Sequence, residues 1–351
     1  MLSRTADHLF WMARYTERAE NTARMLDVHL QTGLLPQPAD HAEQGWRAIL
    51  GISELQSAFD AKYDVLSQKD VIDFMVRDPG NPSSIASCLT QARENARAVR
   101  GALTTEAWEI QNATWLKMQS YLRTRELEQN PSDFFEWVKH RSHLSRGVTI
   151  GTMLVDEALH FIRLGTFLER SDNTARIIDV KFHEATQNQQ KQQQQKQQQQ
   201  KQQIQSQSQS QTQGGGAAQS QSQSVAAVES PVDFYYWAAV LRSVSGFEIY
   251  RRVYRDVITP ERVAELLILR ADMPRSLLGC MGHVVLNLKQ VGNGGSSDTE
   301  RFAGRLHADL EFNQIQNILD DGLHGFLTTF LERIFELGNR ISRDFLVPRT
   351  E

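Results

Sequence analysis

One charged string occurs twice in this sequence, and the repetition limits how the chain can fold. Residues 15–28 read YTERAENTARMLDV and residues 167–180 read FLERSDNTARIIDV, so eight of fourteen positions are identical, including every defined position of Glu-Arg-x-x-Asn-Thr-Ala-Arg. Apolar positions can match by chance in any two amphipathic helices, but a matched set of Glu, Arg and Asn is harder to explain in this way. The pattern therefore indicates a duplication.

The match continues outside these strings, at a separation that changes along the chain. The strings lie 152 residues apart, whereas residues 81–89 (NPSSIASCL) and 273–281 (MPRSLLGCM) lie 192 residues apart. The difference of about 40 is close to the length of a glutamine-rich tract at 187–224. We therefore predict two helical repeats, residues 1–150 and 151–351, with the tract inserted early in the second.

The glutamine-rich tract is unlike the rest of the chain. Of its 38 residues 21 are glutamine, and Ile204 is its only large aliphatic residue. Such a composition cannot bury enough apolar surface to offset the entropy lost on ordering. The sequence therefore predicts a disordered insertion at 187–224.

Elsewhere the apolar residues follow the helical period. From Leu9 to Leu30 they recur at steps of three and four, which predicts a long amphipathic helix that Ser3 can cap and Gly33 ends. No alternating strand pattern of useful length is present. The predicted fold class is all-α, with two tandem homologous helical bundles packed about a pseudo-twofold axis. Further helices are predicted over residues 84–103, 105–128, 132–147, 152–184, 232–256, 260–270, 275–291, 298–318 and 322–346.

Composition excludes several classes of protein. The net charge of -4 provides no basic field for nucleic acid. Two cysteines, Cys88 and Cys280, provide neither a disulfide framework nor a C-x-x-C zinc site. No apolar run reaches the ~18 residues of a membrane span, and the N-terminal sequence lacks a secretory leader. We therefore expect a cytoplasmic protein that binds neither nucleic acid nor membrane.

The charged strings permit three interpretations. On a helix, Glu17, Asn21 and Arg24 lie along one stripe, and the second string repeats it. The stripe could be a solvated face, whose pairs contribute only ~0.2–0.5 kcal/mol each. It could instead form the junction between the repeats, where Glu–Arg pairs and an Asn fix the register. Finally, it could line a polar ligand pocket, with Glu17 or Glu20 as catalytic acid or base.

A second group of charges lies in residues 91–112 (QARENARAVRGALTTEAWEIQN). The second repeat keeps Asn287 and Lys289 at the matching positions but loses most of the charge, which favours a binding surface on the first repeat. Further arginines follow in YRRVYRD and MPRS, and bidentate arginines suit carboxylate or phosphate ligands. The candidate substrate-binding residues are Arg18, Asn21, Arg24, Arg93, Glu94, Asn95, Arg97, Glu169, Arg170, Asp172, Asn173, Arg176, Arg251, Arg252 and Arg275.

Metal and cofactor chemistry find little support. Helical bundles that hold two metals use Glu-x-x-His on two helices, and Glu157-x-x-His160 fits one such half. Asp321-x-x-His324 is a poorer second half, and the repeat partner of Glu157 is Thr5. No phosphate loop or dinucleotide fingerprint is present. We expect no metal and no cofactor.

Several strings together resemble the bacterial alpha-E domain family. They are LSRTADHLFWMARYTERAENTARMLDV, NPSSI, ARENARAVR, EAWEIQN, YRRVYRD, MPRSL and HFIRLGTFLERSDNTARIIDV, and they cover nearly the whole chain except the glutamine-rich tract. The resemblance implies an all-helical protein that works beside a circularly permuted ATP-grasp ligase, with a transglutaminase-like protein as a further partner. It places the family's Glu-Arg motif on residues 17–24 and 169–176, and its Arg-Glu-Asn-Ala-Arg motif on 93–97.

These observations lead to one main hypothesis and two alternatives. The main hypothesis is a scaffold or accessory subunit of an ATP-grasp-type amide ligase system for peptide synthesis or modification, whose charged pocket binds a peptide or amino acid. The first alternative is a stand-alone enzyme with Glu17 or Glu20 as general acid or base, which could be metal-dependent. The second is a purely structural helical interaction module.

Overall fold

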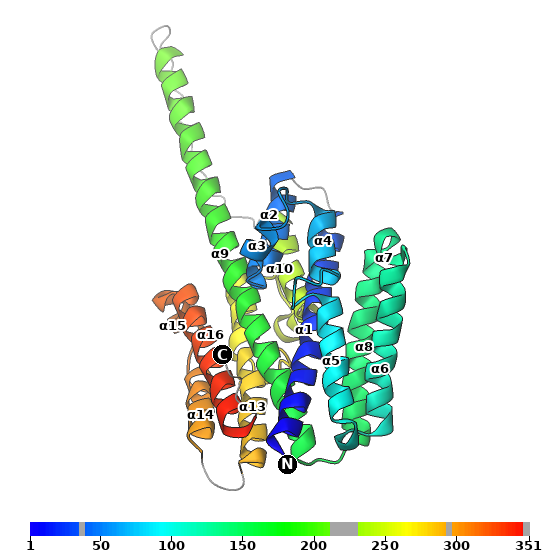
Figure 1. Ribbon diagram of the computed structural model, residues 1–351. Helices are drawn as coiled ribbons and strands as arrows, with labels where there is room; N and C mark the ends of the chain where they lie inside the picture. Colours follow the sequence, from blue (N-terminus) through cyan, green and yellow to red (C-terminus); the bar gives the residue numbers. More distant parts are fainter. Residues whose placement is uncertain (35–38, 211–230, 293–296, 347–351) are drawn as a thin grey trace.

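A computed structural model describes residues 1–34, 39–210, 231–292 and 297–346, and Figure 1 shows a bundle of helices. No strand occurs among the described residues, so the predicted all-α class is confirmed. The first part of the chain contains α1 (Ser3–Gly33), α2 (Ala39–Ile52), α3 (Gln56–Asp60), α4 (Gln68–Val76), α5 (Ile85–Ala98), α6 (Thr105–Arg123), α7 (Glu126–Gln129) and α8 (Pro131–Thr152). The later part contains α9 (Glu157–Ser210), α10 (Pro231–Ser243), α11 (Phe247–Tyr254), α12 (Pro260–Leu269), α13 (Leu277–Val291), α14 (Asp298–Glu311), α15 (Ile315–Asp321) and α16 (Leu323–Phe345).

The helices that carry the two charged strings, α1 and α9, pack against each other at the centre of the bundle (Figure 1). On one flank α1 also packs on α5 and α8, and on the other flank α9 packs on α13 and α16. A Cβ atom on Gly165 of α9 would lie only 2.2 Å from the carbonyl oxygen of Phe10 in α1. Glycine at this position therefore permits the close approach of the two helices.

The buried apolar side chains form two clusters, and α1 contributes to both. Its first half, including Leu9 and Phe10, packs with α9 and with α10 to α16. Its second half, including Ala23 and Leu26, packs with α2 to α8. The boundary between the two clusters thus crosses α1, which ties the first part of the chain to the later part. Among the described residues, no helix is both long enough and apolar enough to cross a membrane.

Several helix boundaries differ from the sequence prediction. Ser3 was predicted to cap α1, but the capping position is Leu2, and no side chain caps the helix. The single helix predicted over 232–256 is broken between α10 and α11, where Ser245 adopts a φ of 54°. The helix predicted over 298–318 is likewise broken, between α14 and α15. Helical periodicity continues across such short breaks, so the spacing of apolar residues alone does not reveal them.

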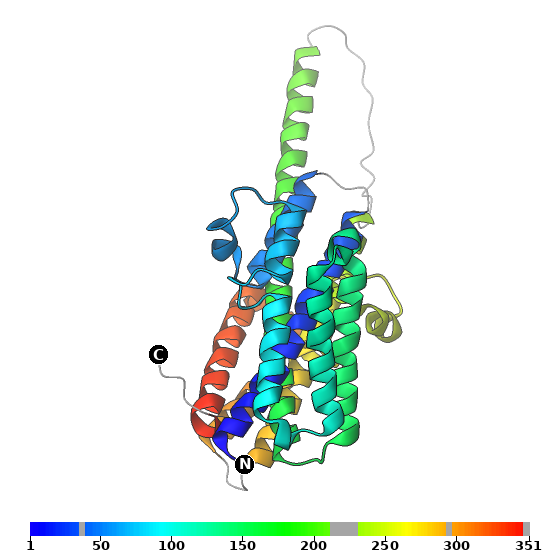
Figure 2. The same cartoon turned by 45° about the vertical axis from the view of Figure 1, so that its right-hand side comes forward.

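Helix α9 continues into the glutamine-rich tract and rises beyond the ends of the other helices (Figure 2). The sequence predicted a disordered insertion over 187–224, whereas the structure describes residues 187–210 as helix. Glutamine has nearly as good a helix propensity as leucine or lysine, so a tract that follows directly on a helix can extend it without tertiary contacts. Residues 211–224 lie outside the described part of the chain, and their disorder stays a prediction.

Segments that match in sequence also make matching contacts. The side chain of Ser84 caps α5 by accepting from Ser87 N, and the side chain of Ser276 caps α13 by accepting from Gly279 N. A histidine near the start of α1 forms a hydrogen bond with an asparagine in α5, and a histidine near the start of α9 forms one with an asparagine in α13. These hydrogen bonds join His8 to Asn95 and His160 to Asn287, each at 2.8 Å.

Candidate functional site

The Glu-Arg pairs of the two strings bind each other reciprocally where α1 meets α9. Arg170 Nε and Nη2 donate to the two carboxylate oxygens of Glu17 at 2.8 and 3.0 Å. In the opposite direction, Arg18 Nε and Nη2 donate to the two oxygens of Glu169 at 2.6 and 3.2 Å. Both glutamates are buried, with 1% and 4% exposure. The strings therefore do not form a solvated face. They join α1 to α9.

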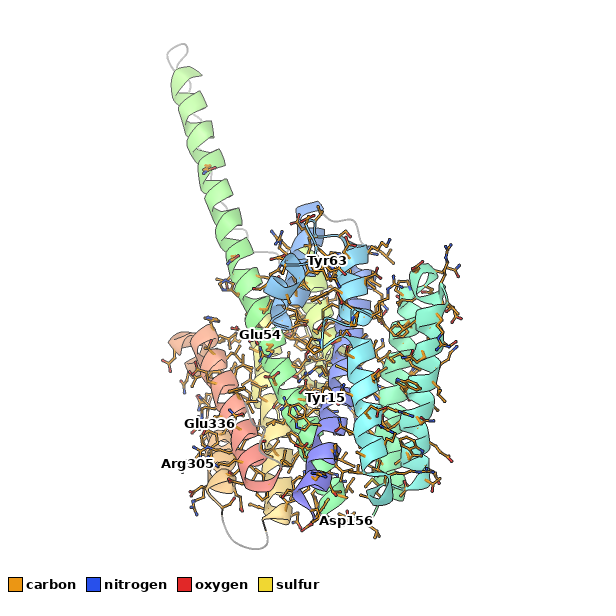
Figure 3. The ribbon with its side chains drawn as sticks, viewed as in Figure 1. Tyr15, Glu54, Tyr63, Asp156, Arg305 and Glu336 are labelled. Atoms are coloured by element: carbon orange, nitrogen blue, oxygen red, sulfur yellow. The ribbon has the colours of Figure 1, made fainter. Side chains whose placement is uncertain are left out.

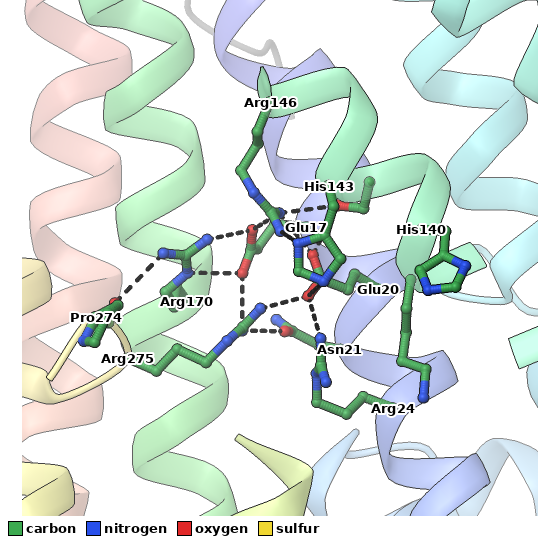
Figure 4. A network of polar contacts seen from close by, with 12 residues as sticks. Glu17, Glu20, Asn21, Arg24, His140, His143, Arg146, Arg170, Pro274 and Arg275 are labelled. Atoms are coloured by element: carbon green, nitrogen blue, oxygen red, sulfur yellow. Dashed lines mark hydrogen bonds and ion pairs between the residues drawn. The ribbon is translucent and has the colours of Figure 1, made fainter. Parts of the chain in front are cut away.

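Around Glu17 the polar groups are tightly packed, as Figure 4 shows. Arg275 Nη1 donates to Glu17 Oε1 at 3.0 Å and to Asn21 Oδ1 at 2.9 Å, and its Nη2 donates to Glu20 Oε1 at 2.6 Å. Arg146 Nη1 lies 2.9 Å from Glu17 Oε2 and 2.6 Å from Glu20 Oε2. We call this group the closed cluster: Glu17, Glu20, Asn21, Arg24, Ser142, Arg146, Arg170 and Arg275.

The closed cluster keeps its two carboxylates ionised. Burial alone would raise the pKa of Glu17, but the guanidinium groups around it, Arg170 foremost, outweigh this and lower the pKa below its ordinary value. Burial acts on Glu20 in the same way, and there Arg275 is the strongest opposing charge, so that the pKa lies well below its ordinary value. Both side chains are thus fixed anions at neutral pH, and neither is poised to exchange a proton.

The second string has a similar carboxylate but more open surroundings. Burial would raise the pKa of Glu169, yet Arg18 and Arg14 outweigh it and lower the pKa to about 2. A pocket of about 210 Å³ lies next to this carboxylate. We call it the open pocket, and its lining residues are Arg18, Asn21, Thr22, Met25, Ile52, Ser53, Glu54, Met75, Ser83, Glu169, Asp172, Asn173 and Arg176.

One wall of the open pocket carries a chain of charges that reaches solvent. Arg176 binds Asp172 through Nε and Nη2 at 3.0 and 3.2 Å, and its Nη1 contacts Glu54. The Glu54 side chain is 72% exposed and lies beside α9, just beyond the end of α2 (Figure 3). The pocket therefore extends from the buried Glu169 toward solvent at Glu54.

Two amides of the open pocket have unused hydrogen-bonding capacity. Asn21 is 2% exposed, and its Nδ2 has no partner among the residues that the structure describes, although its Oδ1 accepts from Arg275. Asn173, at the matching place in the second string, is half-buried, and within the described ranges its amide makes no hydrogen bond to a protein group. A buried donor without a partner costs about 1–3 kcal/mol, which a ligand in the pocket could offset.

The candidate substrate-binding residues at 93–97 lie outside the open pocket. Arg93 contacts Glu94 and stacks over Trp115, with its guanidinium carbon 4.8 Å from the ring centroid. Arg97 pairs with Glu94 at 2.7 Å and is 64% exposed. Asn95 bonds His8 and so belongs to the packing of α5 against α1. The structure does not bring this group together with the charged strings.

The arginines of α11 are also separate from the site. Arg251 and Arg252 are exposed, whereas Arg275, predicted in the same group, is buried in the closed cluster. In the part of the chain that is described, no three His, Cys, Asp or Glu side chains are grouped to hold a metal ion. His160, one half of the weak metal motif, bonds Asn287. Burial raises the pKa of the Cys88 thiol to about 12, so it is no ready nucleophile.

Sequence reasoning missed several residues of the site. Arg14 and Arg146 complete the partners of Glu169 and Glu17, but Arg146 lies on α8 outside every matched string, so no pattern pointed to it. Ser83 and Glu54 line the open pocket from the turn before α5 and the turn after α2. Ser83 could have been found, because it is the position opposite Arg275 in the matched segments NPSSIASCL and MPRSLLGCM.

Comparison with known proteins identifies the family of this chain. The model of the Alpha-E family, described as a predicted alpha-helical domain with a conserved ER motif, matches residues 1–346. The reciprocal Glu17–Arg170 and Glu169–Arg18 pairs involve both Glu-Arg dipeptides of the repeated string. No curated protein and no solved structure matches the chain.

Proposed function

Since the chain belongs to the Alpha-E family, we propose that it is an accessory, substrate-binding subunit of an ATP-grasp-type amide ligase system. In this proposal it works in the cytoplasm beside a circularly permuted ATP-grasp protein, with a transglutaminase-like protein as a second candidate partner. The ligase supplies the ATP chemistry for peptide synthesis or modification, and this chain presents a peptide or amino acid to it.

The open pocket is the observation that carries the proposal. It has charged groups of both signs together with free amide groups, and its volume of about 210 Å³ lies below the ~300–1,000 Å³ of pockets for drug-sized ligands. Such a pocket suits one amino-acid residue or one peptide side chain. Its mouth at Glu54 would leave the remainder of a peptide free to reach a second protein.

The stand-alone enzyme is the weaker alternative. Glu17 and Glu20 do not line the open pocket, and their carboxylate oxygens accept bonds from arginines and a serine in the closed cluster. A general base needs a free lone pair facing the substrate and a pKa near the working pH, and these carboxylates have neither. We therefore assign Glu17 to joining α1 to α9, and Glu20 to joining α1 to α8 and to the turn before α13.

We also propose that the chain is built from two related halves, 1–150 and 151–351, that pack about a pseudo-twofold axis. The reciprocal Glu–Arg pairs support this, because a twofold axis between α1 and α9 requires each contact to occur twice. The matched caps of α5 and α13 and the matched His–Asn bonds point the same way.

The proposed function can be tested by co-expressing the chain with a circularly permuted ATP-grasp protein. We expect the two proteins to co-purify and the rate of ATP-dependent amide formation to rise when the chain is added, as followed by mass spectrometry of the product. The variant Asp172→Asn should keep the association but reduce the rate. Lack of association together with an unchanged ligase rate would contradict the proposal.

A further inference from the structure

The two matched segments before α5 and α13 differ at one charged position. In NPSSIASCL and MPRSLLGCM, Ser83 stands where the later segment has Arg275. The flanking positions agree in structure as well as in sequence: Cys88 Sγ contacts the carbonyl oxygen of Pro82, and Cys280 Sγ contacts that of Pro274. The serine and the arginine therefore lie at corresponding points of two similar turns.

Arg275 shows what a guanidinium does at this point. Its two terminal nitrogens bridge Glu17, Glu20 and Asn21, and the side chain is buried. Each of these three residues has a counterpart in the second string, 152 positions later in the sequence. The counterparts are Glu169, Asp172 and Asn173, and all three line the open pocket together with Ser83.

Apart from the absence of a guanidinium group at Ser83, the ion pairs of the open pocket resemble those of the closed cluster. In the closed cluster, Arg24 pairs with Glu20 one helical turn before it, and in the open pocket Arg176 pairs with Asp172 in the same way. With Arg275 set aside, Glu17 has two arginine partners, Arg170 and Arg146, and Glu169 likewise has two, Arg18 and Arg14. The open pocket lacks a cation that would correspond to Arg275.

The balance of charge also favours an added cation in the open pocket. Two carboxylates face four guanidinium groups in the closed cluster: Glu17 and Glu20 with Arg24, Arg146, Arg170 and Arg275. Three carboxylates and three guanidinium groups meet at the open pocket: Glu54, Glu169 and Asp172 with Arg14, Arg18 and Arg176. A further guanidinium there would face three guanidinium groups, as Arg275 does, but three carboxylates in place of two.

We infer that the open pocket binds the guanidinium group of an arginine, which takes the place that Arg275 fills in the closed cluster. The group contacts Glu169, Asp172 and Asn173, and its fork of donors suits two carboxylates better than a single ammonium does. Asn21 Nδ2 then donates to an oxygen near the guanidinium, as a ligand with a carbonyl or carboxylate would offer. The inference rests on the proposed function and names its substrate class: free arginine or an arginine side chain of a polypeptide.

Isothermal titration calorimetry on the isolated chain tests this inference without any ligase. We expect L-arginine to bind with one site per chain, and L-citrulline, which has a neutral urea group of the same shape, to bind at least about tenfold more weakly. A peptide of acetyl-Ala-Arg-Ala-amide distinguishes the two sources. Tighter binding of the peptide than of L-arginine indicates a polypeptide ligand, and the reverse order indicates the free amino acid.

Two variants at one position provide the decisive comparison. Ser83→Arg supplies the guanidinium from the chain itself, so it should abolish arginine binding and raise the melting temperature. Ser83→Ala is the matched control: it adds no charge and removes only the long hydrogen bond of 3.4 Å that Ser83 Oγ accepts from Arg18 Nη1, so it should bind arginine within about threefold of the parent. Should Ser83→Arg not fold, Asp172→Asn should weaken arginine binding at least about tenfold while citrulline binding stays unchanged.

The outcomes separate the inference from the proposed function. Equal affinities for arginine and citrulline, no binding of either, or full arginine binding by Ser83→Arg would each overturn the inference. If arginine binds as expected but no ATP-grasp protein associates, the ligand assignment holds and the proposed function fails. If the ligase associates and responds to the chain but arginine does not bind, the proposed function holds and the ligand assignment fails.

Discussion

The closed cluster and the open pocket are built from the same string of residues, yet one is filled and the other is hollow. In both, a buried glutamate accepts a bidentate pair of hydrogen bonds from the arginine of the other string. Arg275 fills the space beside Glu17, whereas the shorter Ser83 leaves a pocket of about 210 Å³ beside Glu169. Both halves of the junction hold α1 against α9, and the difference is that only the half at Glu169 leaves space beside its carboxylate.

The sharpest test of this difference is to remove one arginine from each side. Arg275→Met should lower the free energy of unfolding by about 3–5 kcal/mol, because it leaves buried carboxylates with fewer partners. Arg176→Met at the open pocket is the matched control, and its partly exposed pair should cost only about 1 kcal/mol. Urea unfolding followed by circular dichroism measures both. Equal losses would mean that the two sides contribute alike to stability.

Acid unfolding tests the carboxylates of the junction. The pKa of Glu169 falls from its ordinary 4.5 to about 2 in the folded chain, so its stabilising effect is complete above about pH 4.5 and is lost as the pH falls toward 2. The loss should be about 3 kcal/mol in the free energy of unfolding over that range. Glu169→Gln should be less stable at pH 7 and show a shallower decline. A variant with the parent's pH profile would show that Glu169 is not responsible.

The approach of α1 to α9, on which both regions depend, can be loosened at one glycine. Gly165→Ala places a methyl group against the Phe10 carbonyl, which forces the helices apart and should cost about 1–3 kcal/mol. Gly151→Ala, in α8 with open space around it, is the control and should be neutral or stabilising by up to about 1 kcal/mol. Melting temperatures of the two variants make the comparison, and similar values would argue against close packing at Gly165.

The smallest effect is expected for the charged group that lies outside both regions. Arg97→Ala removes a mostly exposed pair with Glu94 and should change the free energy of unfolding by less than about 1 kcal/mol. Arginine binding at the open pocket should stay the same, as calorimetry would record. A large loss of binding would extend the site from the α1–α9 junction onto α5.

The sequence predicted the helical class and the importance of the strings because both depend on local pattern. Helical spacing of apolar residues follows from 3.6 residues per turn, and it placed α1 within its true bounds. It also placed Glu17 and Asn21 on one stripe, where Glu17 binds Arg170 of the other string and Asn21 accepts from Arg275 before α13. The sequence could not say which arginine each glutamate binds, because such pairs join residues more than 100 positions apart.

The candidate site was less accessible from sequence than the fold. Residues 93–97 were predicted to bind substrate because they carry more charge than their counterparts, but a charged helix face is equally compatible with exposure, which is what Arg97 shows. Arg146 had no repeat counterpart to single it out. Ser83 is uncharged, and its role follows only from the space that it leaves open.

By itself the sequence determined that this chain forms long amphipathic helices and that two of them carry one charged string. Only the tertiary structure decided that each string binds the other. It also decided that Arg275 fills the space beside Glu17 and Glu20, and that the corresponding space beside Glu169 stays open at Ser83. The physical reason is that helix formation depends on residues within a few turns. Burial, ion pairing and empty space depend on side chains from distant helices that meet only in the folded bundle.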